Sequence, residues 1–291
     1  IAGTVSAQYY GANDKEKLIQ ALHAVSENDI NEWMHILIAP EMRGRLAGDI
    51  GYDLAAQWAA DSLAAWGLKP FPGFNGYFQE FSQPYTLIHE KGSLSIVDGK
   101  RPASIIKEYA YADDYFPSGL SGSGSVVAEV VYAGFCIVAP ELGYNDFSGI
   151  DVKGKILICE QGSPYTGNNP DTLEMWYPFT QSDYKIRQAA QLGAKGILMA
   201  YHAASPRPTV LPDMLYLSVA DNVVSDIIAG SGNDLGQIRE GIRSSTSPFS
   251  FNTGTTVAME VVSSFHPEGK TSNVVAIIEG SDPGLKNEYM I

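Results

Sequence analysis

Apolar residues in the first part of the chain recur at helical spacing. They repeat every three or four positions from Asp14 to Val25, which predicts a first helix. Ser26 and Asp29 then have the spacing of a capping box, and the apolar repeat resumes after them, so we expect a second helix that Pro40 ends. Two glycines and two arginines follow over 41–48, where we expect a loop.

A third helix and a strand complete this amino-terminal pattern. The helix is predicted from an apolar face that Gly67 and Pro70 bring to an end. That face consists of Ala55, Ala59, Leu63 and Trp66. Aromatic and polar residues then alternate from Tyr77 to Phe81, which is typical of a half-buried strand.

Between Gly92 and about Ser250 the pattern changes to short apolar runs divided by glycine, proline and serine. Two helices are expected there, Ser182–Leu192 and Asn222–Ala229, because each is followed by a glycine. The apolar runs predict strands at Ser93–Val97, Val126–Tyr132, Lys155–Cys159, Gly196–Met199 and Met214–Val219. A further predicted strand, Val257–Val262, is expected to return to the outer domain, which is the domain formed by the segments before and after this stretch.

One more apolar run, Asn273–Gly280, lies near the carboxyl end of the sequence. It is short and ended by glycine, which predicts a strand buried on both faces. A turn over 281–284 then leads into a second strand, Lys286–Ile291. Because an apolar strand needs partners for its backbone and side chains, we expect the sequence to belong to a longer protein.

Two separated stretches, 40–70 and 271–291, read "PEMRGRLAGDIGYDLAAQWAADSLAAWGLKP" and "TSNVVAIIEGSDPGLKNEYMI". Both resemble parts of the zinc-dependent aminopeptidase family that includes aminopeptidase Y and the glutamate carboxypeptidase-like enzymes. The resemblance implies that Glu288–Ile291 leads into a loop with the first histidine and the bridging aspartate of a two-zinc centre. Those ligands would lie beyond Ile291. We therefore assign no catalytic or metal-binding residue in this chain and expect its two zinc ions only in the longer protein.

The stretch between these two parts resembles a second family. Residues 131–165 and 185–202 read "VYAGFCIVAPELGYNDFSGIDVKGKILICEQGSPY" and "KIRQAAQLGAKGILMAYH", which resemble the protease-associated domain. The expected fold class is thus α/β plus a β-rich insert, an incomplete mixed-sheet zinc-peptidase domain interrupted by a protease-associated domain. The expected boundaries are 1–91 and 251–291 for the peptidase-like part and 92–250 for the insert.

Composition and charge narrow the function classes. The chain has 291 residues with 45% hydrophobic and 18% charged residues, which are values of a globular protein. A formal charge of -14 argues against nucleic acid as a partner, because phosphate binding requires clustered lysine and arginine. No apolar run approaches the roughly 18 residues of a membrane span. Val5-Ser-Ala7 before Gln8 has the pattern of a signal-peptidase site, so we expect an exported, periplasmic or extracellular protein.

Few residues suggest chemistry of their own. Cys136 and Cys159 each lie in a predicted strand, either as buried small side chains or as one disulfide between neighbouring strands. Arg43 and Arg45 either support a substrate or anchor their loop. The histidines have no ligand spacing, although His202 could contact a ligand. They are His23, His35, His89, His202 and His266.

Two further segments are predicted to be irregular. Ser118–Ser125 is rich in glycine and serine, which predicts a flexible connection and no phosphate-binding loop. Gly162–Thr180 predicts a long loop with several aromatic residues, which either line a substrate pocket or pack within the loop. They are Tyr165, Trp176, Tyr177 and Phe179.

Two functions are compatible with this sequence. The first is part of a secreted zinc-dependent aminopeptidase that acts on peptides, with the insert covering or shaping the substrate site and this chain inactive by itself. The second is a non-catalytic module that binds proteins or peptides through the protease-associated domain. A histidine and an aspartate two residues apart soon after Ile291 would favour the enzyme.

Overall fold

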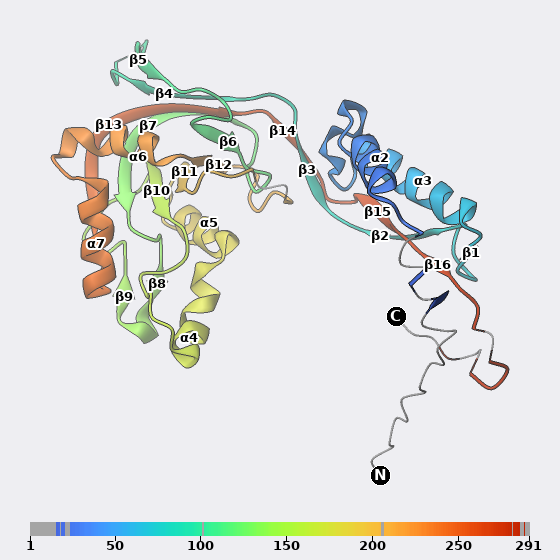
Figure 1. Cartoon of the computed structure of the whole chain (residues 1–291). Coiled ribbons are helices and arrows are strands. Elements are labelled where there is room, and N and C mark those ends of the chain that lie inside the picture. The colour runs from blue at the N-terminus through green and yellow to red at the C-terminus, as the bar shows by residue number, and fades with distance from the viewer. Residues whose placement is uncertain are drawn as a thin grey trace. The chain divides into compact units, whose positions relative to one another are not determined.

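The computed structural model describes residues 16–17, 19–20, 24–100, 102–204, 207–280, 282–285 and 288. Half of the predicted helix Asp14–Val25 and most of the predicted strand Lys286–Ile291 lie outside these residues. The chain divides into two compact units, which are described separately (Figure 1). Unit 1 comprises residues 1–81 and 271–291, and unit 2 comprises residues 82–270.

Unit 1 begins with the helices that the sequence predicts. Helix α2 has Ser26 as its N-cap, and the capping box with Asp29 is confirmed. The loop over 41–48 contains a short 3-10 turn and a kink with positive φ at Arg43, Gly44 and Arg45. The helical elements are α2 (Glu27–Leu37), η1 (Pro40–Arg45) and α3 (Ile50–Ala65).

Short strand pairs complete unit 1. Strand β1 (Lys69–Pro70) pairs antiparallel with β16 (Ala276–Ile277), and β2 (Phe78–Ser82) pairs with β15 (Lys270–Val274). The Tyr52 hydroxyl of α3 donates a hydrogen bond to the Ser272 carbonyl oxygen at 2.5 Å, which ties the helix to β15.

Two sequence predictions for unit 1 are wrong. The run Asn273–Gly280 is not a buried strand, because it is divided between β15 and β16 and its residues are partly or fully exposed; Ile278 is 81% exposed. Trp66 of the predicted apolar face is also exposed, and α3 instead buries Ala56 and Ala60. In both cases the apolar pattern is present, but the described segments leave these side chains partly or largely exposed.

Unit 2 contains an eight-stranded mixed sheet in the order β5-β4-β13-β7-β10-β11-β12-β6. Strands β7, β10, β11 and β12 run parallel, and the other four pairings are antiparallel. The strands are β4 (Ser93–Val97), β5 (Ile105–Glu108), β6 (Tyr115–Pro117), β7 (Gly124–Ala133), β10 (Ile156–Glu160), β11 (Gly196–Ala200), β12 (Leu215–Val219) and β13 (Ser250–Val261).

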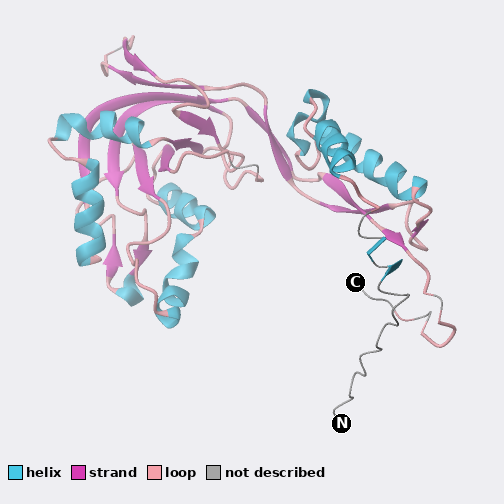
Figure 2. Cartoon of the chain, in the orientation of Figure 1, coloured by secondary structure: helices cyan, strands magenta, loops and turns pink. Residues whose placement is uncertain are grey.

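Smaller elements flank this sheet (Figure 2). Strand β3 (Tyr85–Ile88) pairs antiparallel with β14 (Ser263–His266), and β8 (Val138–Ala139) pairs antiparallel with β9 (Tyr144–Asn145). The helical elements are η2 (Pro140–Leu142), α4 (Pro170–Thr180), α5 (Ser182–Gln191), α6 (Asp221–Ile228), η3 (Ala229–Ser231) and α7 (Leu235–Ser245).

Both faces of the large sheet are covered, as the continuous apolar runs of its parallel strands require. Alternate residues of β10 point to opposite faces, with Ile156 and Ile158 in one core and Leu157 and Cys159 in the other. The first core includes the apolar side of α6 and α7, and the second includes Ile186 of α5. The mixed α/β class with a strand-rich insert is thereby confirmed.

Several elements of unit 2 differ from the sequence predictions. Strand β13 does not return to the outer domain, because it lies within the sheet between β4 and β7. The compact units accordingly do not coincide with the expected boundaries at 91 and 250. Much of the predicted loop Gly162–Thr180 is helix α4, which starts where the Asn169 side chain accepts a hydrogen bond from the Thr172 amide.

The segment Ser118–Ser125 is not a flexible connection throughout. Ser118 and Ser121 are buried, and the Ser121 hydroxyl accepts a hydrogen bond from the Tyr216 amide at 3.0 Å. A Cβ on Gly122 would come within 1.7 Å of the Pro212 carbonyl oxygen, so glycine is required for this close packing. Gly122 therefore permits a close contact between two backbone segments here.

Candidate functional site

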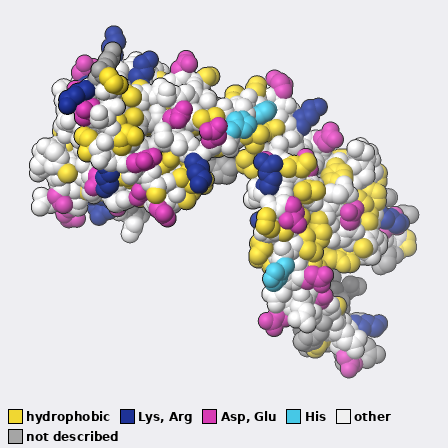
Figure 3. All heavy atoms as spheres, turned by 90° about the horizontal axis from the view of Figure 1, so that it is seen from above, with side chains coloured by type: hydrophobic (Ala, Val, Ile, Leu, Met, Phe, Trp, Pro, Cys, Tyr) yellow, Lys and Arg dark blue, Asp and Glu magenta, His cyan; other side chains and the backbone are white. Residues whose placement is uncertain are grey.

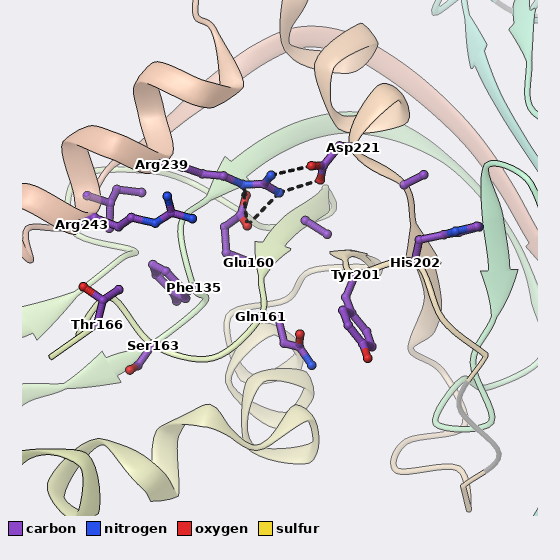
Figure 4. Close-up of a pocket in the computed structure, with 13 residues that line it drawn as sticks. Phe135, Glu160, Gln161, Ser163, Thr166, Tyr201, His202, Asp221, Arg239 and Arg243 are labelled. Atoms are coloured by element: carbon purple, nitrogen blue, oxygen red, sulfur yellow. Dashed lines mark hydrogen bonds and ion pairs between the residues drawn. The ribbon is translucent and has the colours of Figure 1, made fainter. Parts of the chain in front are cut away.

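The candidate site is a cavity of about 620 Å³ in unit 2, at the carboxyl ends of β10, β11 and β12 (Figure 4). Glu160 and Ala200 end β10 and β11, and Asp221 begins α6 two residues after β12. Parallel strands bring their carboxyl ends to one edge of a sheet, where open α/β folds commonly bind ligands. The topology alone therefore gathers these side chains, which are far apart in the sequence.

An arginine between two carboxylates forms one wall of the cavity. Arg239 of α7 donates from Nε to both oxygens of Glu160, at 3.2 and 3.1 Å, and from Nη1 and Nη2 to Asp221, at 2.7 and 2.8 Å (Figure 4). These hydrogen bonds hold the pKa of Asp221 below its usual range. Tyr132 donates a further hydrogen bond to Glu160 at 3.0 Å. All three nitrogens of Arg239 are thus engaged within the protein.

A buried lysine fixes the turn that follows β10. Lys185 of α5 is fully buried, and its Nζ donates to the carbonyl oxygens of Glu160 and Gly162 at 2.7 and 2.8 Å. The same nitrogen lies 5.4 Å from the centre of the Phe135 ring. Burial lowers the pKa of Lys185 to about 7. The side chain therefore holds the backbone from which the cavity residues Gln161 and Ser163 project.

A buried carboxylate fixes a second turn, between β7 and β8. Asp146 accepts hydrogen bonds from the amides of Phe135 and Ile137, both at 3.0 Å, and from the Tyr144 hydroxyl at 2.8 Å. Burial raises the pKa of Asp146 to about 6 even though these bonds favour the charged form. A Cβ on Gly134 would lie 2.3 Å from Asp146, so the turn requires glycine there.

The two cysteines form a disulfide between this turn and β10. Both cysteines are fully buried, and their Cα atoms lie 5.5 Å apart. Of the two alternatives for Cys136 and Cys159, the structure therefore contains the disulfide. Together with Asp146 it anchors Phe135, whose ring lines the cavity.

Most of the aromatic residues of 162–180 pack inside unit 2 and do not line the cavity. Trp176 is buried and makes edge contacts with Tyr144 and Phe179, at centroid distances of 5.3 and 6.5 Å. Tyr165 packs against the same cluster. Tyr177 is the exception, because it is 65% exposed on α4. Packing therefore accounts for three of the four residues.

The described histidines lie on separate elements, and of them only His89 and His266 come close to a common side chain. His202 lines the cavity and stacks on Phe116, with ring centroids 4.9 Å apart. His89 and His266 both lie within hydrogen-bonding distance of the Ser264 hydroxyl, at 2.7 and 3.0 Å. His35 lies apart on α2, and His23 falls outside the described residues.

Arg43 and Arg45 hold the loop of unit 1. Arg43 forms an ion pair with Asp49 at 3.1 Å, and Arg45 donates to the Leu37 carbonyl oxygen. No group of three histidine, cysteine, aspartate or glutamate side chains in the described part of the chain could hold a metal ion. The residues described here therefore do not fit the two-zinc centre that the resemblance implies for a longer protein.

Sequence reasoning missed Lys185, Arg239 and Arg243. A buried lysine has no sequence signal of its own, because a lysine in an amphipathic helix is ordinarily on the exposed face, whereas Lys185 lies on the buried face of α5. Helix α7 did have a signal: Asp234 is its N-cap, and Leu235, Ile238 and Ile242 recur at helical spacing and are buried. Glycines at 236 and 241 weaken that pattern.

Comparisons with known proteins agree with part of this description. Residues 123–226 match the family described as the PA domain, which confirms the protease-associated domain predicted from the sequence. No curated protein matches the chain. None of the helices that the structure describes is long and apolar enough to cross a bilayer.

Two solved structures are similar to the chain at low identity. The aminopeptidase from Aneurinibacillus sp. strain AM-1 is 16% identical with a TM-score of 0.46, and the match covers 87% of this chain and 48% of that one. The zinc aminopeptidase BSAP from Bacillus subtilis is 14% identical with a TM-score of 0.45, and the match covers 86% and 46%. The chain thus spans about half the length of these proteins.

Proposed function

We propose that this chain is part of a secreted zinc-dependent aminopeptidase, in which unit 2 covers or shapes the site that binds the peptide. The observation that carries the proposal is the PA domain at 123–226, flanked by two stretches, 40–70 and 271–291, that resemble one peptidase family. The zinc ligands would come from further sequence of the same protein. Zinc in such a centre activates a water molecule for attack on a peptide bond.

Unit 1 supports the proposal through its exposed apolar side chains. None of the residues of α2, all of which the structure describes, is buried. Ile38, Ile50 and Trp66 are each more than half exposed. Apolar residues at this density usually lie against another part of a protein. Unit 1 is thus suited to be one segment of a larger peptidase domain.

The disulfide supports the secreted location. Cys136 and Cys159 are paired in the structure, and disulfides persist mainly in oxidising compartments such as the periplasm and the extracellular space. In the reducing cytosol of most organisms, both thiols would stay reduced. The small-residue pattern at Val5–Ala7 points to the same location.

The test compares the purified 291-residue chain with the longest natural form of the protein. We expect the 291-residue chain to hold no stoichiometric zinc by elemental analysis and to release no amino acid from chromogenic aminoacyl substrates. The long form should hold two zinc ions and cleave those substrates in a chelator-sensitive way. Zinc and chelator-sensitive activity in the 291-residue chain would contradict the proposal.

A second candidate is a non-catalytic binding module, and the cavity at the end of β10–β12 favours it. That cavity lies entirely within unit 2 and needs no residue from a catalytic domain. If the long form holds no zinc and cleaves nothing but still binds peptides, this second function is the correct one.

A further inference from the structure

We propose that the cavity of unit 2 binds the carboxylate group of a peptide, with Arg243 as the cation that anchors it. This inference concerns a ligand site within unit 2, and it does not depend on whether the longer protein cleaves peptides.

Arg243 is placed at the cavity by the amphipathic pattern of α7. Leu235, Ile238 and Ile242 are buried against the sheet, and Arg239 and Arg243 each follow one of the last two in the sequence. Residues four apart lie on the same side of a helix, so the two arginines are neighbours on one edge of the buried face. Both line the cavity (Figure 4).

The two arginines differ in what they bind. Arg239 is held by Glu160 and Asp221 through all three of its nitrogens. The side chain of Arg243 has no hydrogen bond or ion pair with any residue that the structure describes. The two carboxylates of this wall share Arg239, so the formal charges of Glu160, Asp221, Arg239 and Arg243 sum to zero, and Arg243 is the one of the four whose side chain has no partner among the described residues. A ligand group that pairs with Arg243 should therefore be an anion.

The facing loop provides neutral groups that could complete an anion site. Ser163 and Thr166 line the cavity on the side opposite α7 (Figure 4). The Ser163 hydroxyl makes only a long 3.5 Å bond to the Tyr165 carbonyl oxygen, so it can turn toward a ligand. Lys185 fixes the backbone before this loop. A backbone that is held in place before binding reduces the ordering cost of binding.

The shape and lining of the cavity favour a peptide over a small inorganic anion. A volume of about 620 Å³ is far larger than a phosphate ion needs and is typical of sites for small organic ligands. The Phe135 ring and Ile242 provide apolar surface next to the cation. A carboxylate beside an apolar side chain is the chemistry of a peptide's carboxyl terminus, and an acidic residue within a peptide has the same anionic group.

The overall charge of the chain argues against a polyanionic ligand. At -14 the protein repels polyanions at long range, and a single unpaired guanidinium cannot offset that repulsion. Arginine binds carboxylates through two parallel hydrogen bonds, so one residue is sufficient for a monoanion.

The experiment measures fluorescence anisotropy of dye-labelled peptides with the whole 291-residue chain. The probes are Ala-Ala-Ala-Phe with a free carboxyl terminus, the same peptide as its carboxyl-terminal amide, and Ala-Ala-Asp-Phe as its amide. We expect the free acid to bind at least about tenfold more tightly than the first amide. Binding of the aspartate peptide in preference to the first amide would show that an internal acidic residue also serves as the ligand.

The variants locate the binding at Arg243. Arg243→Ala should weaken binding of the acidic probes at least about tenfold, and Arg243→Lys should have an intermediate effect because it keeps the charge but not the paired donors. Arg187→Ala is the matched control, because Arg187 is an exposed arginine of α5 outside the cavity, and it should bind like the unmodified chain.

Three results with the peptides would overturn the proposal. They are equal binding of the free acid and the first amide, undiminished binding by Arg243→Ala, and an equal loss in Arg187→Ala. Binding of inorganic phosphate alone, with none of the peptides bound, would also contradict it. Since the exposed side chain of Arg243 makes no hydrogen bond or ion pair with a described residue, loss of folding does not complicate the variant.

Discussion

The two units of this chain have similar apolar patterns but differ greatly in how much of the pattern they bury. In unit 2 the large sheet has a core on each face, and residues such as Ile158 and Leu217 are fully buried. In the described part of unit 1, the buried apolar side chains are Met42, Ala56 and Ala60 alone. Figure 3 shows hydrophobic side chains gathered on the surface of unit 1. An apolar pattern thus specifies which face of an element can be covered, but the covering itself depends on other segments.

The largest expected effect concerns which fragment folds by itself. A fragment of residues 82–270 should show a cooperative thermal transition, because it retains the whole sheet of unit 2. A fragment of residues 92–250 should show none, because it lacks most of β13, the strand between β4 and β7. Circular dichroism during heating measures both. A cooperative transition in 92–250 would mean that β13 is dispensable.

The next largest effect should come from truncating one apolar side chain, and its size should differ between the two units. Ile158→Ala in unit 2 should lower the free energy of unfolding by about 3 kcal/mol, because it leaves a cavity in a fully buried core. Ile38→Ala in unit 1 should change it by less than about 0.5 kcal/mol, because Ile38 is 63% exposed. Urea unfolding of the whole chain measures both variants. An equally large loss in Ile38→Ala would show that the apolar side of α2 is covered in solution.

The disulfide should stabilise unit 2 and leave unit 1 unaffected, because both cysteines lie in unit 2. The 23-residue separation of the cysteines corresponds to about 3 kcal/mol. Reduction with dithiothreitol should therefore lower the melting temperature of the 82–270 fragment. The double variant Cys136→Ala, Cys159→Ala should melt at a lower temperature and should not respond to dithiothreitol. A melting temperature that the reductant leaves unchanged in the unmodified fragment would contradict the pairing.

The smallest expected effect is a dependence of unit 2 stability on pH. Burial raises the pKa of Asp146 to about 6 in the folded state, above its unfolded value near 3.8. The folded state therefore binds more protons between these values, so the contribution of Asp146 is complete below about pH 4 and is lost as the pH rises to about 6. Urea unfolding of 82–270 at several pH values measures the slope.

Asp146→Asn provides the control for this slope, because asparagine does not titrate. The variant should lose the decline between about pH 4 and 6, whatever its overall stability. The buried amine of Lys185 faces the same carboxylate and favours its charged form, so it limits the size of the effect. An identical slope in the variant would assign the decline to other groups.

The sequence predicted local features of both units more completely than long-range ones. The capping box at Ser26, the strand Ser93–Val97 and the helix before Gly193 all follow from neighbouring residues and are confirmed. The position of β13 was wrong because strand pairing joins segments far apart in the chain, and the strand's own residues do not specify the partner. The cavity could not be predicted for the same reason, because its walls come from the ends of separate strands and from α7, which are far apart in the sequence.

Individual polar residues were harder to assign than elements. The pairing of Cys136 with Cys159 was one of two alternatives, because spacing in the sequence does not determine distance in a fold. The roles of Lys185 and Asp146 depend on burial and on backbone groups that only the folded chain brings together. Arg239 and Arg243 have the same residue type and lie on the same helix, and only the positions of Glu160 and Asp221 make them different.

The pairing of β3 with β14 has a consequence for how this molecule could have arisen. Both ends of unit 2 lie on one two-stranded ribbon, where Tyr85 pairs with His266 and the Gln83 amide donates to the Gly269 carbonyl oxygen at 2.8 Å. An insertion whose two ends already lie side by side adds little closure entropy to the chain that receives it. Such a segment can be gained, exchanged or removed during evolution as a single cassette, because the host chain only has to span the short gap between two adjacent strands.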